Sequence, residues 1–211
     1  MDQHFDELRR DYPDLLAPER LWSRAEVLTS PSPVPKSPGV YAWYFNRVPQ
    51  RVPTADCLTV GGLTLLYVGI SPKAPPTNGA QASRQTLRSR LQYHMRGNAE
   101  GSTLRLTLGC LLSEQLGLGL CRVGSGTRLT FCEGERRLSE WLAENAFVTW
   151  MTCPEPWVIE EELIRHVALP LNLDQNDGHL FHPVLTAIRK TARAAARQSA
   201  IWHPPSGPMR R

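Results

Sequence analysis

Six polar side chains, widely separated along the chain, form a set that is suited to cutting a phosphodiester bond. They are two phenols, a guanidinium, an imidazole, a carboxylate and an amide, supplied by Tyr41, Tyr67, Arg90, His94, Glu160 and Asn172. A lone carboxylate holds a hard cation such as Mg²⁺ or Mn²⁺, the cation activates water, and an arginine steadies the phosphate. Their types, order and spacing indicate this chemistry only when they are taken together.

Two of the six lie one helical turn apart. The pattern over residues 84–96 predicts a helix, and Ser83 is the residue expected to cap its N-terminus. Arg90 and His94 are four positions apart, so they share one face of this helix and can act on one ligand. The alternative interpretation is a solvated arginine and a surface histidine on an amphipathic helix.

The carboxylate lies in a predicted helix that begins at Pro156, since proline fits the first turn of a helix. Glu160 falls on the apolar stripe of this helix, which is formed by Leu163, Ile164 and Val167. A carboxylate there is costly unless a cation or a hydrogen-bond network binds it. An acidic first turn that complements the helix dipole is the alternative. Glu161 has an i,i+4 partner in Arg165, and Glu162 is expected to face solvent.

Further polar residues follow this helix. Asn172 lies between two leucines, which predicts a half-buried amide that must find a hydrogen-bond partner, although a loop-closing asparagine gives the same pattern. Asp174, Asp177, His179 and His182 lack the tight spacing of a metal site, and we interpret them as loop residues.

The last predicted helix, from Pro183 to Ser199, carries Arg189, Arg193 and Arg197 at a spacing of four. A one-sided basic stripe is typical of contact with a nucleic-acid backbone, and a solvated helix face is the more common alternative. The net charge of +4 permits a polyanionic partner without requiring one.

These residues are carried by the elements of a mixed α/β domain with insertions. Apolar β-rich runs at residues 40–45 and 63–70 include the two tyrosines, and a third run covers 146–152. A proline-rich linker over residues 30–38 leads into the first run and cannot be helical. The remaining patterns predict a polar helical lead-in before the linker, helices over residues 18–29, 103–116 and 134–145, a strand pair near 119–132, and a loose tail from His203.

Composition places further bounds on the protein. A chain of 211 residues can bury a core as one domain. The five cysteines are scattered and form no Cys-x-x-Cys pair, which argues against a disulfide framework or a zinc knuckle and favours a reducing compartment. We find no signal-peptide pattern and no apolar run long enough to span a bilayer. We therefore expect a cytoplasmic protein with no membrane partner.

The motifs resemble those of the GIY-YIG endonuclease superfamily. They are Gly-Val-Tyr at 39–41, Tyr-Val-Gly at 67–69, Leu-Arg-Ser-Arg-Leu at 87–91, and Glu-Glu-Glu-Leu-Ile at 160–164 followed by Pro-Leu-Asn at 170–172. Arg90 falls on the arginine of the family's helix, and His94 follows it by one turn, as in restriction-enzyme members. The resemblance divides the chain into a lead-in and linker (1–38), a nuclease-like domain (39–173) and a basic helix with a tail (174–211).

The resemblance implies a small three-stranded antiparallel sheet flanked by helices, and a one-metal hydrolysis of DNA. Glu160 would be the only protein ligand of Mg²⁺ or Mn²⁺, Tyr41 the general base and Tyr67 a group that orients water or phosphate. Arg90 would contact the scissile phosphate, His94 would hydrogen-bond the tyrosine or water, and Asn172 would brace the site. Lys73, in place of a family lysine where this chain has Ile70, and Arg88 are expected as further nucleic-acid contacts.

The chain departs from the family pattern in its insertions, at residues 46–62, 71–83 and 103–145, which would build a substrate platform or cap the groove. An endonuclease of restriction, repair or defence is the leading hypothesis. The alternative is a catalytically inactive nucleic-acid-binding module of the same fold. No separate recognition domain is evident, so specificity would come from the insertions, a homodimer or a partner protein. RNA is an open alternative to DNA.

Overall fold

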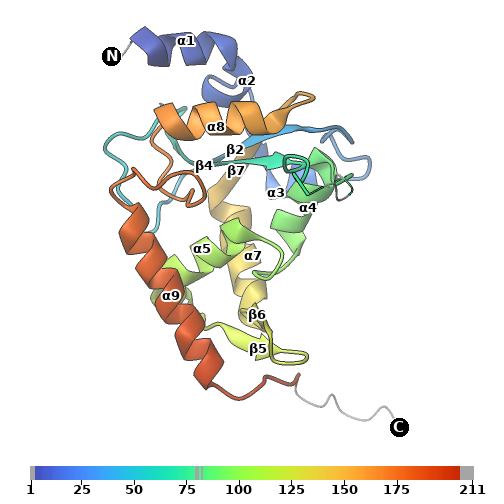
Figure 1. The fold of residues 1–211 in the computed structure, drawn as a ribbon, viewed down its shortest axis with the longest axis vertical. Helices are drawn as coiled ribbons and strands as arrows, with labels where there is room; N and C mark the ends of the chain where they lie inside the picture. Colours follow the sequence, from blue (N-terminus) through green and yellow to red (C-terminus); the bar gives the residue numbers. More distant parts are fainter. Residues whose placement is uncertain (1–2, 79–80, 82, 205–211) are drawn as a thin grey trace.

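The computed structural model describes residues 3–78, 81 and 83–204, and most of the predicted tail falls outside this part. Its centre is an antiparallel sheet of five strands in the order β1-β7-β2-β4-β3 (Figure 1). The strands are β1 (Trp22–Ser23), β2 (Gly39–Phe45), β3 (Thr59–Val60), β4 (Leu63–Ser71) and β7 (Ala146–Thr152). The expected three-stranded sheet is incomplete, because β1 and β3 are two-residue edge strands that are too short to show a periodic pattern.

Helices cover both faces of this sheet, so β2 is buried along its whole length. Successive side chains of β2 alternate between two apolar cores. One core lies against α4 (Leu87–Arg96), α5 (Thr103–Leu111) and α7 (Gly134–Asn145). The other lies against α1 (Gln3–Asp11), α2 (Pro13–Leu16) and α8 (Pro156–His166), which Figure 1 shows above the sheet.

Two further helices and a β-hairpin follow. They are α6 (Ser113–Leu116), a hairpin of β5 (Cys121–Val123) and β6 (Arg128–Thr130), and α9 (His182–Gln198). The hairpin and α9 occupy the lower half of the molecule in Figure 1. Helix α9 packs along α5 and reaches β5. In the described part of the chain, no helix has the length and apolar character that crossing a membrane requires.

The helix predicted over residues 18–29 is wrong in most of its length. Trp22 pairs with Val148 of β7, and only α3 (Arg24–Val27) is helical. The helical turn follows from a capping box, in which Ser23 and Glu26 satisfy each other's backbone N–H groups. A single capped turn is too short to displace the edge strand that precedes it.

Candidate active site

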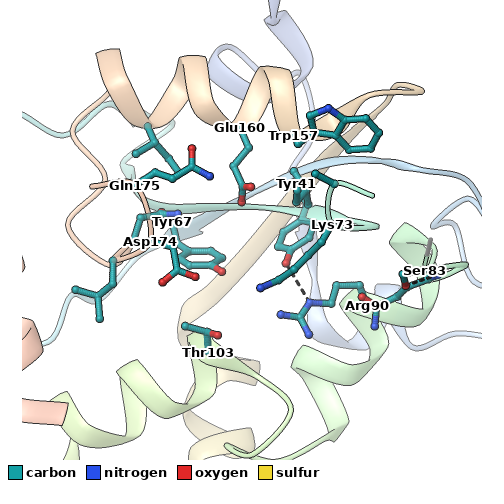
Figure 2. A pocket seen from close by; sticks show the side chains of 16 residues that line it. Tyr41, Tyr67, Lys73, Ser83, Arg90, Thr103, Trp157, Glu160, Asp174 and Gln175 are labelled. Atoms are coloured by element: carbon teal, nitrogen blue, oxygen red, sulfur yellow. Dashed lines mark hydrogen bonds between the residues drawn. The ribbon is translucent and has the colours of Figure 1, made fainter. Parts of the chain in front are cut away.

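A cleft of about 480 Å³ opens where β2, β4, α4 and α8 meet. Figure 2 shows the side chains that converge on it, among them Tyr41 from β2, Tyr67 from β4, Arg90 from α4 and Glu160 from α8. Asn172 also lines the cleft. The structure therefore brings five of the six predicted residues to one cavity, and the sixth, His94, lies behind Tyr41.

The phenol of Tyr41 is positioned by three neighbours. Its hydroxyl lies 2.8 Å from His94 Nε2. It also accepts a hydrogen bond from Arg90 Nε at 3.4 Å, the dashed line between these two residues in Figure 2. Gly69 is its partner in the register of β2 and β4, and a Cβ atom there would lie 2.6 Å from the Tyr41 hydroxyl. The glycine of the second motif thus makes room for the tyrosine of the first.

His94 is fully buried, so the surface-histidine interpretation is wrong. Its Nδ1 lies 2.7 Å from the hydroxyl of Ser102, the N-cap of α5. Burial, followed by the charges of Arg90 and Arg105, lowers the pKa of His94 well below its usual value. The imidazole is therefore neutral at pH 7, and it accepts from one of its two hydroxyl partners while it donates to the other.

Burial keeps both phenols protonated in the resting site. It raises the pKa of Tyr41, while the charge of Arg90 partly offsets the rise. It raises the pKa of Tyr67 well above its ordinary value, and Tyr41 and Glu160 add to this effect. Neither tyrosine is a standing phenolate, so a proton must leave as any reaction at Tyr41 proceeds.

Glu160 combines burial with the lack of a bonded partner. Within the described residues no hydrogen bond or ion pair holds its carboxylate, and burial raises the pKa of Glu160 to about 7, with Lys73 and Arg90 opposing the rise and Asp174 adding to it. The first turn of α8 contains no acidic residue, so the interpretation of Glu160 as an acidic helix start is wrong. Its carboxylate points into the cleft in Figure 2.

Asn172 closes the edge of β4 beside Tyr67. Its Oδ1 accepts from the Val68 backbone N–H at 3.0 Å, and its Nδ2 donates to the Val68 carbonyl at 2.9 Å. The predicted hydrogen-bonded amide is confirmed, and it is more deeply buried than expected, with 5% of its surface exposed. Asn172 therefore fixes the backbone of the residue next to Tyr67.

The five predicted nucleic-acid contacts lie in three different places. Lys73 is exposed and lines the cleft. The guanidinium of Arg88 donates instead to the carbonyls of Val34 and Ser32, so it fastens the proline-rich linker onto α4. Three arginines of α9 line a second, smaller hollow formed with α5 and the β5–β6 hairpin, and they are Arg189, Arg193 and Arg197.

Two local expectations need correction. Thr86 rather than Ser83 caps α4, because Thr86 and Ser89 form a reciprocal capping box. Ser83 instead lines the cleft. Glu162 does not face solvent alone, since the Tyr12 hydroxyl donates to its carboxylate at 2.5 Å. Such a contact spans the fold and leaves no local pattern in the sequence.

Several residues that hold or line the site are not predicted by any sequence pattern described above. Ser102 is recognisable as a cap before a helical run, but its contact with His94 is tertiary. Arg105 is fully buried, forms an ion pair with Glu135 at 2.6 Å and donates to the His94 carbonyl at 3.2 Å. Asp174, interpreted as a loop residue, lines the cleft, as do Thr103, Trp157 and Gln175.

Cysteine, histidine and acidic side chains do not gather into a closed metal centre. In the parts of the chain that the structure describes, no three of them stand together as a set of metal ligands. The polar residues after α8 contact one another or the nearby backbone. His182 lies 3.1 Å from Asp177, and His179 accepts a hydrogen bond from the Phe181 backbone N–H. Asp177, His179 and His182 therefore hold the loop against the start of α9, while Asp174 lines the cleft.

Comparison with known proteins gives one positive result. A family model described as "GIY-YIG catalytic domain" matches residues 39–195. No match is found among curated proteins or among solved structures. The matched region contains all six residues of the predicted set, and it continues past residue 173 through most of α9.

Proposed function

Since the chain belongs to the GIY-YIG nuclease superfamily, we propose that it is a metal-dependent endonuclease that hydrolyses phosphodiester bonds in DNA. One observation carries the proposal: Tyr41, Tyr67, Arg90 and Glu160 come from four separate elements and meet in one cleft. A module that only binds nucleic acid has no use for an unpaired, desolvated carboxylate at this position, because the carboxylate repels phosphate.

The residues around Glu160 fit a hydrated hard cation. One carboxylate faces an open cleft, with exposed Asp174 near it, so water and phosphate oxygens would occupy most coordination positions, as Mg²⁺ prefers. Glu160 would hold Mg²⁺ or Mn²⁺, which when bound would activate water and neutralise charge on the phosphate. A bound cation would also neutralise the Glu160 carboxylate, to which no described residue forms a hydrogen bond or an ion pair.

His94 would orient the phenol of Tyr41 toward the attacking water. In one of the two possible hydrogen-bond arrangements, the Tyr41 hydroxyl donates to Nε2 of the neutral His94, and Nδ1–H donates to Ser102. This arrangement would fix the Tyr41 oxygen beside the cleft, where it can accept a hydrogen bond from the attacking water while His94 stays neutral.

Arg90 is placed to bind the phosphate that is cut. Its Nη1 donates to the Gly101 carbonyl at 2.9 Å and its Nε donates to Tyr41, which fixes the plane of the guanidinium. No described residue accepts a hydrogen bond from Nη2, so this donor remains for a phosphate oxygen. A fixed donor aimed at developing charge stabilises the transition state without reorganisation.

The test of the proposed function is a cleavage assay on supercoiled plasmid, branched DNA and structured RNA, each with Mg²⁺, Mn²⁺ or EDTA. Glu160→Gln, purified in parallel, controls for contaminating nucleases. We expect metal-dependent cleavage of DNA that is absent in EDTA and in the variant. Binding of DNA without cleavage in any metal would favour the inactive module, and cleavage of RNA alone would replace DNA as the substrate.

Gly69→Ala should lower the cleavage rate by about 100-fold while the protein remains folded. The added methyl would collide with the Tyr41 phenol, and a displacement of about 1 Å in a catalytic group costs rate on this scale. Gly119→Ala is the matched control, because nothing lies within 4 Å of a Cβ at Gly119. We would measure kcat and the thermal unfolding temperature of both variants and of the wild type. A wild-type rate for Gly69→Ala would show that the position of the phenol does not matter.

A further inference from the structure

The three arginines of α9 line the smaller hollow, of about 290 Å³, which we call the arginine hollow. Helix α9 supplies its basic side, the N-terminal part of α5 supplies a second, and the β5–β6 hairpin supplies a third. The residues that matter for the argument are Arg189, Arg193, Arg197, Thr103, Glu100 and Leu129. This hollow is distinct from the cleft that contains Glu160.

A solvated basic face does not explain the arginine hollow, because Arg189 is only 8% exposed. Its Nη1 makes a long hydrogen bond of 3.4 Å to Thr107 Oγ1. Its Nε is buried and has no hydrogen-bond partner in the described part of the chain. A charged donor that is buried without an acceptor is costly. The positive charge of Arg189 is therefore left without a paired counter-charge among the described residues at the border of the arginine hollow.

The charges around the arginine hollow are not balanced by ion pairs. Within the described residues none of its three arginines forms a salt bridge. The acid that lines it, Glu100, already accepts from the Leu129 backbone N–H at 2.8 Å. Burial lowers the pKa of Arg189, and the like charge of Arg193 lowers it further. An anion would relieve both effects.

The arginine hollow adjoins the cleft. Thr103, the first residue of α5, lines both cavities. A helix N-terminus carries positive partial charge and free N–H groups, so this border also favours an anion. Asp174, in the cleft, is close enough to Arg189 for its charge to raise the pKa of that guanidinium, which partly offsets the effect of burial. A polyanion that leaves the cleft past Thr103 would therefore come next to the arginines of α9.

We propose that the arginine hollow binds backbone phosphates of the nucleic-acid strand beyond the phosphate that Arg90 holds, with Arg189, Arg193 and Arg197 as the cationic ligands. This inference rests on the proposed function and specifies its substrate. From Arg189 to Arg197 the helix advances about 12 Å, which suits several successive phosphates better than one. Such contacts fix the strand without reading its sequence. The substrate is thus a polynucleotide that extends past the cut on the α9 side.

The experiment measures DNA binding as a function of salt in EDTA, with a fluorescent 20-nucleotide single strand and the matching duplex as probes. Arg193→Gln is compared with Lys190→Gln, because both remove one positive charge from α9 and Lys190 is exposed outside the hollow. We expect Arg193→Gln to reduce the slope of log K against log[salt] by about 0.7–0.9. Lys190→Gln should leave the slope unchanged.

Arg197→Gln provides a second variant, because Arg197 is exposed and its replacement does not disturb the core. The arginine hollow would be refuted as a phosphate site if the slope of log K against log[salt] were the same for Arg193→Gln, Arg197→Gln and Lys190→Gln. This conclusion would hold even if the wild-type protein cleaves DNA. A flattened slope for Arg193→Gln, in a protein that cuts no nucleic acid with any metal, would support the hollow and refute the endonuclease. The two proposals therefore fail separately.

Discussion

Replacing Glu160 by glutamine should abolish cleavage and at the same time stabilise the folded protein. Glutamine keeps the size of the side chain but offers a neutral oxygen, which is a far weaker ligand for Mg²⁺ than a carboxylate. Because no three His, Cys, Asp or Glu side chains in the described chain stand together as metal ligands, the loss should not be compensated elsewhere. Binding of DNA in EDTA should be retained, since the variant removes a negative charge from the phosphate site.

The gain in stability follows from the raised pKa of Glu160. Its value of about 7 in the folded state exceeds the unfolded value of 4.5, so the unfolded chain ionises this group first. Ionisation of Glu160 therefore costs the folded protein stability. This free-energy cost is small below pH 4.5, grows between pH 4.5 and 7, and reaches about 3 kcal/mol above pH 7. Glu160→Gln removes this cost, and the free energy of unfolding at pH 8 in EDTA should rise by about that amount.

Urea unfolding at two pH values measures this effect. At pH 5 the difference between Glu160→Gln and wild type should shrink below about 1 kcal/mol. Glu161→Gln is the matched control, because Glu161 is exposed and pairs with Arg165 at 2.6 Å, as the sequence predicted. That change should leave cleavage intact. Metal-dependent cleavage by Glu160→Gln, or an equal effect of both variants, would remove Glu160 from the proposed metal site.

The predicted set could be found from the sequence because each member stands beside a strong local signal. Tyr41 and Tyr67 lie in apolar runs bounded by glycine, and these runs are β2 and β4. Arg90 and His94 share the i,i+4 spacing of one helix. Glu160 interrupts an apolar stripe. Patterns of this kind depend on a few neighbouring residues, so they survive the insertions between the motifs.

What the sequence does not reveal depends on contacts between distant segments. The buried Arg105 and its partner Glu135 lie on different helices, so no local pattern in the sequence shows that they pair. Arg189 belongs to a regular basic stripe, and only the packing of α9 on α5 buries it. Periodicity predicts the face of a helix but not what covers that face. The network behind His94 and the arginine hollow therefore appear only in three dimensions.

Arg90→Ala should lower kcat by about 100- to 1,000-fold, the usual effect of removing one transition-state donor. Arg90→Lys should recover only part of the rate, because lysine keeps the charge but lacks the planar fork that reaches Gly101, Tyr41 and a phosphate together. Arg96→Ala, on the same helix and exposed, should keep the wild-type rate.

Chemical rescue separates a catalytic role of Arg90 from a merely structural one. Added guanidinium ion should restore cleavage in Arg90→Ala and not in Glu160→Gln, because only the first variant leaves a hole of that shape beside the phosphate. An Arg90→Ala protein that cuts at a near-wild-type rate would show that the active-site assignment is wrong. Loss of activity without rescue, together with a lower free energy of unfolding, would show that Arg90 has only a structural role, in which it links Tyr41 to the Gly101 carbonyl.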